Sequence, residues 1–313
     1  MATPKYTFLL PAFKGKYLDE MLKRPQKNTM ISIIICSRQK DIPQKLYQNI
    51  DKTIGVDYEI IVIDNSNNEY SMCSAYNAGV KRARFPYLCF MHEDIIYMTK
   101  DWGMRVIDHL SDTNTGIIGN FGGHYIPDFF PAIYVDGPVT GQFIQGQTIN
   151  GRYITNKVDY HKFCEGKSVE VAVVDGMWFC STKKLFDRVK FDELIFSNFH
   201  CYDLDICMQM HAIGKQVKVI LDILVEHGSP GNMDIKFFNQ LHLWYEKWHA
   251  YFPLLRGVDK KSIPERIKSL ESYCVYKSIS KLEFQKKWQE VEYSQRYRFG
   301  CKIFRVIDFL RGR

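Results

Sequence analysis

Three apolar segments, each followed by a short polar tip, recur in the first third of the chain and constrain its fold more than any other feature. They are "MISIIICSR" at 30–38, "YEIIVIDNS" at 58–66 and "PYLCFM" at 86–91. Segments with helical spacing, "DIPQKLYQNIDKTI" and "SMCSAYNAGVKRA", lie between them. Continuous apolar strands that alternate with helices are typical of a parallel sheet covered on both faces. The sequence therefore predicts an α/β fold with a mixed, mainly parallel sheet flanked by helices.

Polar side chains follow each of these strands at the point where the strand ends. The three tips are Cys36-Ser37-Arg38, Asp64-Asn65 and His92-Glu93-Asp94. In sheets of this kind ligands bind beyond the carboxyl ends of the strands. Gathering an imidazole and carboxylates at the end of a buried strand costs desolvation free energy unless partners compensate it. We therefore expect the tips to converge on one ligand-binding crevice.

The rest of the chain divides by composition. Residues 116–168 are rich in Gly, Pro and aromatic residues, which predicts loops and short hairpins. Residues 169–186 read as a strand, a turn and a helix, and residues 201–231 as a helix that stops at Gly214 and a strand that ends near His227. Beyond 232 the period is mostly helical. We divide the chain into an N-terminal extension (1–29), a central domain (30–231) and a helical C-terminal region (232–313).

Composition and charge bound the class of protein. Of 313 residues, 46% are hydrophobic and 25% are charged, as in a soluble globular protein. We expect no secretory signal at the start and no spanning helix, because no apolar run reaches about 18 residues. The nine cysteines include no CxxC pair, which favours reduced thiols in a cytosol. The net charge of +7 suits an anionic ligand, an anionic membrane surface or nucleic acid without choosing among them.

The C-terminal segment "RYRFGCKIFRVIDFLRGR" has an apolar helical face and many basic side chains. Ile303, Val306, Ile307 and Leu310 share that face. This pattern is compatible with an interfacial helix on anionic lipid, and equally with a helix that docks on the protein's own core.

Five segments occur in an order that resembles a known enzyme family. They are "ISIIICSR", "EIIVIDNS", "AYNAGVKRARFPYLCFMHEDI", "VDGMWFCSTKKLFDRVKFDE" and "YDLDICMQMHAIG". Together they resemble family 2 glycosyltransferases, and the overall look is closest to the streptomycin-biosynthesis glycosyltransferase-like subgroup. The resemblance covers about 30–230. It implies a GT-A fold, the Rossmann-like fold of nucleotide-diphospho-sugar transferases, with 116–168 as variable loops on the acceptor side.

The resemblance implies a divalent cation, Mn²⁺ or Mg²⁺, that neutralises the diphosphate leaving group of a sugar donor. The family holds it with an Asp-x-Asp-like signature at a strand end, and His92-Glu93-Asp94 matches that signature here. Asp94 is the expected metal ligand, and His92 stands where the family has its first Asp. His227 matches a late histidine of the family, and imidazole suits Mn²⁺ better than Mg²⁺.

The resemblance also implies a catalytic base. The family's Glu-Asp-x-Asp-Leu at a helix start matches Tyr202-Asp203-Leu204-Asp205-Ile206. Asp203 holds the position of the base that takes the acceptor's hydroxyl proton in an inverting transfer. Tyr202 stands where the family has Glu. We expect Asp205 to brace the helix start or to bond nearby backbone.

Matching the family's other segments yields candidates for the two substrates. The donor-binding candidates are Ser37, Arg38, Asp64, Asn77, Arg82 and Glu93, and the acceptor-binding candidates are Asp175, Gly176 and Trp178. A Trp face stacks well on a sugar ring, although a core role suits Trp178 as well. The aromatic loops of 121–145 are candidate acceptor walls.

The expected function is inverting, metal-assisted transfer of one sugar to a glycan or lipid-linked acceptor in surface polysaccharide synthesis. The donor would be a UDP-, GDP- or dTDP-sugar, and no nucleic acid partner is expected. The location would be cytoplasmic, with peripheral contact to the inner face of the membrane.

Three alternatives stay open. A non-catalytic sugar-nucleotide-binding protein is compatible with His92 and Tyr202 at positions where the family has acids. A nucleotidyltransferase normally carries a Gly-rich phosphate loop, and "IIICSRQKDIP" has no glycine. A zinc site built from His200, Cys201, Cys207 and His211 lacks the paired spacing of structural sites.

Overall fold

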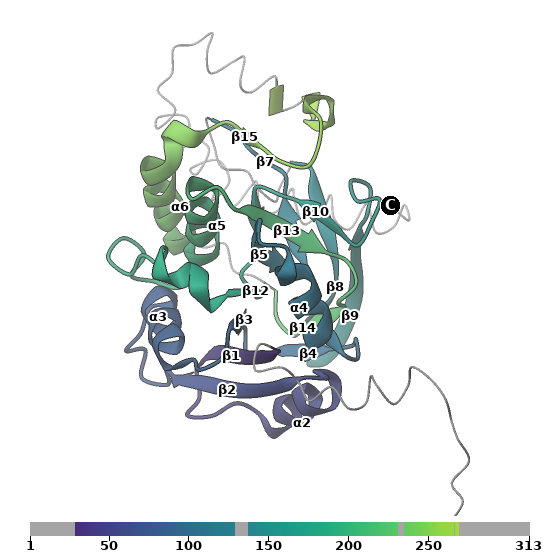
Figure 1. The fold of residues 1–313 in the computed structure, drawn as a ribbon, viewed down its shortest axis with the longest axis vertical. Coiled ribbons are helices and arrows are strands. Elements are labelled where there is room, and N and C mark those ends of the chain that lie inside the picture. The colour runs from purple at the N-terminus through teal and green to yellow at the C-terminus, as the bar shows by residue number, and fades with distance from the viewer. Residues whose placement is uncertain (1–28, 129–136, 231–234, 266, 269–313) are drawn as a thin grey trace, which may run out of the picture.

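A computed structural model of the chain describes residues 29–128, 137–230, 235–265 and 267–268 (Figure 1). Residues 1–28 of the predicted N-terminal extension and the basic segment that ends the chain lie outside the described residues. The boundaries of the three predicted regions stay a prediction.

The first part of the chain alternates strands and helices as predicted. The elements are β1 (Met30–Ser37), α2 (Gln44–Thr53), β2 (Asp57–Asp64), α3 (Met72–Arg82) and β3 (Tyr87–Met91). Strand β1 pairs in parallel with both β2 and β3. Its residues Ile33 and Ile34 are fully buried in different clusters of the core. The strand therefore has no solvent-facing side, which explains its continuous apolar run.

These strands belong to a seven-stranded sheet with the order β10-β13-β5-β12-β3-β1-β2. The added strands are β5 (Thr115–Gly119), β10 (Ser168–Glu170), β12 (Trp178–Thr182) and β13 (Gln216–Ile220). The sheet is mixed, as predicted, but β12 runs antiparallel to both β3 and β5, and β10 runs antiparallel to β13. Trp178 at the start of β12 lies opposite Met91 at the end of β3. The chain thus enters β12 at the edge of the sheet where the parallel strands end, so β12 runs antiparallel to them.

A second sheet lies beside the first and has the order β11-β6-β8-β14-β4, with β9 paired to β8. Its strands are β4 (Ile95–Tyr97), β6 (Phe121–Gly123), β8 (Val139–Ile149), β9 (Arg152–Tyr160), β11 (Val173–Val174) and β14 (Val225–His227). The prediction of loops and short hairpins over 116–168 is wrong for β8 and β9, which form one long hairpin. Asn150 and Gly151 at its turn have φ of 50° and 76°, as the tight hairpin turn with two left-handed residues requires.

Helices cover both faces of the seven-stranded sheet (Figure 1). They are α2 and α3, already described, with α4 (Trp102–Ser111), α5 (Tyr202–Ala212) and α6 (Ile235–Trp248). Residues of α3, α5 and α6 share one buried cluster with Ile34, and residues of α2 and α4 share the other with Ile33. Gly214, with φ of 77°, follows α5 as the predicted stop.

The smaller elements are the pair β7 (Tyr125–Ile126) and β15 (Leu254–Leu255), with single 3₁₀ turns at Lys183–Asp187, His249–Tyr251 and Lys260–Ser262. The helix predicted at the end of 169–186 is therefore one 3₁₀ turn. Among the helices that the structure describes, none is long and apolar enough to cross a lipid bilayer.

Candidate active site

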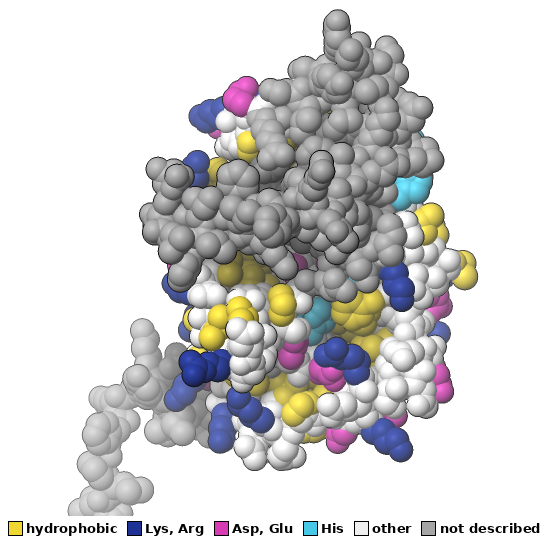
Figure 2. Space-filling model, turned by 180° about the vertical axis from the view of Figure 1, so that it is seen from behind, with side chains coloured by type: hydrophobic (Ala, Val, Ile, Leu, Met, Phe, Trp, Pro, Cys, Tyr) yellow, Lys and Arg dark blue, Asp and Glu magenta, His cyan; other side chains and the backbone are white. Residues whose placement is uncertain are grey.

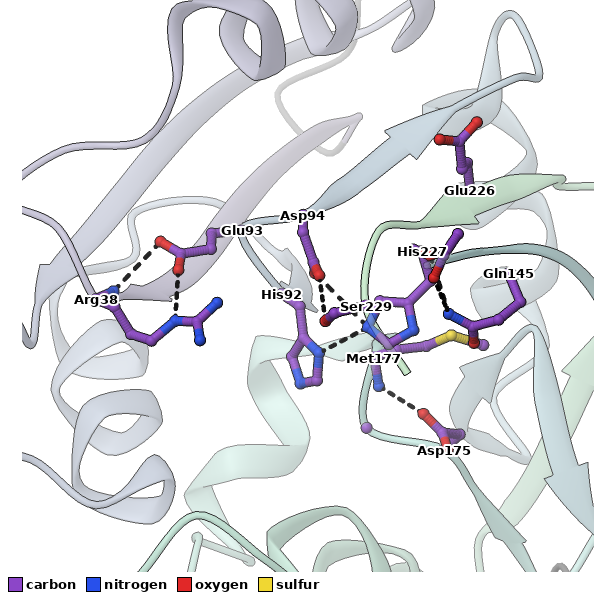
Figure 3. Close-up of polar contacts among 12 residues, drawn as sticks. Arg38, His92, Glu93, Asp94, Gln145, Asp175, Met177, Glu226, His227 and Ser229 are labelled. Atoms are coloured by element: carbon purple, nitrogen blue, oxygen red, sulfur yellow. Dashed lines mark hydrogen bonds and ion pairs between the residues drawn. The ribbon is translucent and has the colours of Figure 1, made fainter. Parts of the chain in front are cut away.

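The predicted metal ligands come together where β3 and β14 end. His92 and Asp94 follow β3, and His227 is the last residue of β14. One ligand atom from each lies within 4.8 Å of the others. His227 Nε2 is 3.3 Å from His92 Nδ1 and 3.6 Å from Asp94 Oδ1, and Ser229 Oγ donates to Asp94 Oδ2 at 2.6 Å (Figure 3). We call His92, Asp94 and His227 the triad.

The chemistry of the triad fits a divalent cation. Burial, and after it the neighbouring His227, lower the pKa of His92 to about 4. His92 is therefore neutral at pH 7 and keeps a nitrogen lone pair for a ligand bond. Two imidazole nitrogens with one carboxylate oxygen suit a transition-metal ion such as Mn²⁺ better than Mg²⁺, which prefers oxygen ligands.

Asp203, the predicted base, lies at the start of α5 and faces Asp175. Burial, and after it the charge of Asp175, raise the pKa of Asp203 to about 7, although hydrogen bonds from backbone N–H groups partly oppose the rise. The segment that carries Asp175 packs directly on the helix start. A Cβ at Gly176 would overlap the hydroxyl of Tyr202 and lie 3.0 Å from Asp203 Oδ2. Only glycine allows this close approach.

Two adjoining pockets meet at the triad. The strand-end pocket is lined by Cys36, Arg38, Asn65, Asn68, Met72, His92, Glu93, Asp94, Phe199, His227, Ser229 and Pro230. The helix-start pocket is lined by His92, Phe121, Phe143, Gln145, Asp175, Gly176, Met177, Phe199, His200, Cys201, Tyr202, Asp203, Leu204, His227 and Phe237. His92, His227 and Phe199 therefore line both. Figure 2 shows a histidine near the middle of the back face, with acidic, basic and hydrophobic side chains around it.

Three of the donor-binding candidates form one cluster at the strand-end pocket. Ser37 Oγ donates to Glu93 Oε2 at 2.5 Å. Arg38 Nε donates to Glu93 Oε1 at 3.0 Å (Figure 3). The Arg38 side chain is 81% exposed, so its guanidinium can reach a ligand. Asp64 lies beside Ser37 at the end of β2 but is exposed, and hydrogen bonds from Ser66 lower its pKa. Asp64 lines neither pocket, whereas the next residue, Asn65, does.

The structure places the other candidates outside both pockets. The Asn77 amide bonds the backbone nitrogen and oxygen of Phe191, which ties α3 to that segment. Arg82 donates to Val62 O at 3.2 Å, two residues before the end of β2. Trp178 is fully buried and donates to the Tyr97 hydroxyl at 2.8 Å. Its indole presents no face to a sugar, because it belongs to the core.

The acceptor-binding candidates Asp175 and Gly176 do line the helix-start pocket. Phe121 and Phe143, from the loops predicted as acceptor walls, line it too, while 129–136 lies outside the described residues. The zinc alternative finds no cluster in the described part of the chain. Cys207 accepts from Val174 N, and His211 bonds Ala172 O.

The sequence analysis missed several residues of the site, among them Ser229, which donates to Asp94, and Phe199, which lines both pockets. Two more contact the histidines of the triad. The Tyr202 hydroxyl lies 2.9 Å from His92 Nε2 and donates to Gly176 O at 3.1 Å. Gln145 Nε2, from β8, donates to His227 O at 3.2 Å (Figure 3). Tyr202 could have been found as the residue that replaces the family's Glu, whereas nothing in the sequence marks Gln145.

Comparison with curated proteins finds no match. Among solved structures, the chain is similar to A197 from STIV, with a TM-score of 0.37 and 10% identity over 66% of this chain and 86% of that one. It is also similar to GalNAc-T7 with UDP, GalNAc and Mn²⁺, with a TM-score of 0.45 and 11% identity. That match covers 86% of this chain and 58% of the GalNAc-T7 chain.

A family model described as "Glycosyltransferase like family" matches residues 32–246. The matched range contains the triad, the strand ends and Asp203, and it spans more than half of the chain. The chain therefore belongs to the glycosyltransferase-like family and is a glycosyltransferase.

Proposed function

We propose that this glycosyltransferase moves one sugar, with inversion, from a nucleotide-diphosphate sugar to an acceptor hydroxyl, and that a divalent cation at the triad assists. The observation that carries the proposal is the position of the triad. His92 and His227 line both the strand-end pocket and the pocket that contains Asp203. A donor in one pocket and an acceptor in the other would meet beside these residues.

The strand-end pocket is suited to the donor. It lies at the carboxyl ends of β1, β2 and β3, where sheets of this kind bind nucleotides. The exposed Arg38 guanidinium can bond a phosphate. A cation held by His92, Asp94 and His227 would stabilise the charge that grows on the diphosphate as the glycosidic bond breaks. The donor set favours Mn²⁺ for this role.

The helix-start pocket is suited to the acceptor. Asp203 would take the proton of the attacking hydroxyl, and a carboxyl with a pKa of about 7 is well matched to that task near neutral pH. Attack in one step places the new bond on the face opposite the leaving diphosphate, which inverts the anomeric carbon. Asp175 helps by keeping the pKa of Asp203 high.

The finer parts of the proposal rest on the family resemblance. They are a UDP-, GDP- or dTDP-sugar as donor, and a glycan or lipid-linked acceptor in surface polysaccharide synthesis at the cytoplasmic face of a membrane. Likeness to the streptomycin-biosynthesis glycosyltransferase-like subgroup belongs to the same proposal.

Thermal unfolding with a panel of UDP, GDP, dTDP and CMP, with and without Mn²⁺, tests the proposal. A ligand at a hundred times its dissociation constant stabilises the fold by about 2.7 kcal/mol, which is readily measured. We expect one nucleoside diphosphate to stabilise the protein only when Mn²⁺ is present. Asp94→Ala should abolish this effect, and the control Asp108→Ala, on the exposed side of α4, should not. Absence of any nucleotide effect would overturn the proposal.

The anomeric outcome needs a second measurement. Proton NMR of the product formed from the donor that binds should show the inverted anomer. Retention would overturn the role of Asp203 as base and would point to Asp175 or Asp203 as a nucleophile.

A further inference from the structure

Tyr202 lies between the triad and the base, and the proposed function gives it no role. Its side chain is 4% exposed and packs edge-on against Tyr76, with ring centroids 5.5 Å apart. It is the first residue of α5 and is followed directly by Asp203. Its hydroxyl contacts two groups, Gly176 O at 3.1 Å and His92 Nε2 at 2.9 Å.

The directions of these two hydrogen bonds can be worked out from the groups involved. The Gly176 carbonyl can only accept, so the single proton of the Tyr202 hydroxyl is donated to it. The phenol oxygen can then only accept from His92. His92 Nε2 must therefore carry the ring proton.

This arrangement decides which nitrogen of His92 is available. A neutral imidazole with its proton on Nε2 has a lone pair on Nδ1. Nδ1 is the atom that faces the triad, 3.3 Å from His227 Nε2 (Figure 3). With the other tautomer, Nδ1 would point an N–H into the triad and could not bind a cation. Partners that fix the tautomer and orientation of a ligand in this way commonly set metal affinity.

We propose that Tyr202 is a positioning residue of the cation site, which holds His92 as the Nε2–H tautomer with its Nδ1 lone pair directed into the triad. The inference rests on the proposed function, in which the triad holds a cation. It also gives a reason for tyrosine where the related enzymes have glutamate. A glutamate would add a third charge beside Asp175 and Asp203, whereas the tyrosine hydroxyl acts without charge.

Removing single hydroxyls tests the inference on the full chain. Tyr202→Phe deletes the oxygen that contacts His92. Tyr76→Phe is the matched control, because Tyr76 lies in the same aromatic cluster and its buried hydroxyl has no hydrogen-bond partner in the described part of the chain. Mn²⁺ binding is measured by the EPR signal of the free ion. We expect Mn²⁺ to bind Tyr202→Phe about 10- to 100-fold more weakly than wild type, the usual effect of losing such a partner. Tyr76→Phe should bind like wild type.

Nitrogen-15 NMR of the wild-type protein without metal shows which ring nitrogen of His92 carries the proton. A Tyr202 that only packed in the core would have no effect on the position of this proton. The His92 signals, assigned by their loss in His92→Ala, should show a protonated Nε2 and an unprotonated Nδ1. Tyr202→Phe should show a mixture of tautomers. The wild-type spectrum decides the point even if the variant fails to fold.

The outcomes separate this inference from the proposed function. Equal Mn²⁺ affinity in wild type and Tyr202→Phe, or a wild-type His92 protonated on Nδ1, overturns the role of Tyr202 and leaves the proposed function intact. Absence of Mn²⁺ binding to wild type, with and without the nucleoside diphosphate, overturns the cation site and this inference together.

Discussion

Two carboxylates near the start of α5, Asp205 and Asp203, lie on different sides of the helix and have different neighbours. Asp205 faces α6 and is 1% exposed. Its Oδ1 accepts from Lys247 Nζ and Trp248 Nε1, both at 2.7 Å, and its Oδ2 accepts from Gln209 Nε2 at 2.7 Å. Asp203, two residues earlier, faces the helix-start pocket and the carboxylate of Asp175.

The difference shows that burial alone does not identify a functional carboxylate. Burial raises the pKa of both Asp203 and Asp205. On the α6 side, Lys247 and hydrogen bonds oppose the rise, and the contact of Asp205 with Lys247 ties α5 to α6. On the pocket side, Asp175 adds to the rise, so Asp203 exchanges a proton near neutral pH. We expect the first region to carry stability and the second to carry catalysis.

The largest expected effect is on turnover, which should depend on Asp203 and not on Asp205. Asp203→Asn removes the proposed base and should lower turnover of the bound donor by about 10²- to 10⁴-fold, the usual contribution of general-base catalysis. Asp203→Asn should still bind the nucleoside diphosphate. Release of nucleoside diphosphate from the donor, with acceptor or water, measures this. The matched change Asp205→Asn should reduce turnover only as far as it reduces the folded fraction. Equal turnover in Asp203→Asn and wild type would contradict the comparison.

The next effect concerns stability on the α6 side. Lys247→Met leaves Asp205 buried without its cation and should lower the free energy of unfolding by about 3 to 5 kcal/mol. Adding Asp205→Asn to Lys247→Met should restore part of this loss, because the buried residue 205 is then neutral. The restoration is partial because Asp192, which also pairs with Lys247 at 2.8 Å, keeps its charge. Denaturant unfolding measures all three proteins. The exposed Lys261, paired with Asp259, provides the control, and Lys261→Met should leave stability unchanged.

On the side of α5 that faces the helix-start pocket, we expect that removing a carboxylate stabilises the fold instead of destabilising it. Because the folded-state pKa of Asp203 lies above its ordinary value, ionising Asp203 destabilises the fold, and the penalty is complete above about pH 7. Asp203→Asn should therefore raise the free energy of unfolding at pH 8, by up to about 4 kcal/mol for a pKa that rises from about 4 to about 7, and should change little at pH 3. Thermal unfolding at the two pH values measures this. A loss of stability at pH 8 would indicate that Asp203 serves the helix dipole instead.

The smallest expected effect is a shift in the pH profile. Activity should rise with pH through about 7 as Asp203 loses its proton, and should level off above that value. Asp175→Asn removes a neighbouring negative charge, so the rise should move to lower pH by about one unit or less. A profile of kcat/KM against pH in both proteins measures the shift. A rise that stays in place would show that Asp175 does not act on Asp203.

Much of the sheet could be predicted from the sequence because its strands are buried on both faces. The apolar runs of β1, β2 and β3 mark their own positions, and the polar residues after them mark the edge where a ligand binds. His92 and Asp94 were predicted at this edge for that reason, whereas His227 was predicted from the family resemblance. The β8–β9 hairpin was missed because β9 is exposed along almost its whole length and has no apolar period.

The candidates that lie outside both pockets do so because of the direction of their side chains. Trp178 is close in sequence to Asp175 and Gly176, yet its side chain points into the core, whereas those two residues line a pocket. Asn77 lies on the predicted helix but bonds the backbone of Phe191, 114 residues away. Contacts of this kind, like that of Tyr202 with His92, depend on the packing of distant segments, which local periodicity does not determine.

The pKa of the Asp203 carboxyl, measured directly, tests the contrast between the two sides of α5. Carbon-13 NMR of the protein labelled at aspartate carboxyls would follow the titration, and Asp203→Asn would assign the signal. We predict a midpoint near pH 7 that falls in Asp175→Asn. A midpoint at or below the ordinary value of about 4 would contradict the proposal that Asp203 is held ready as the base.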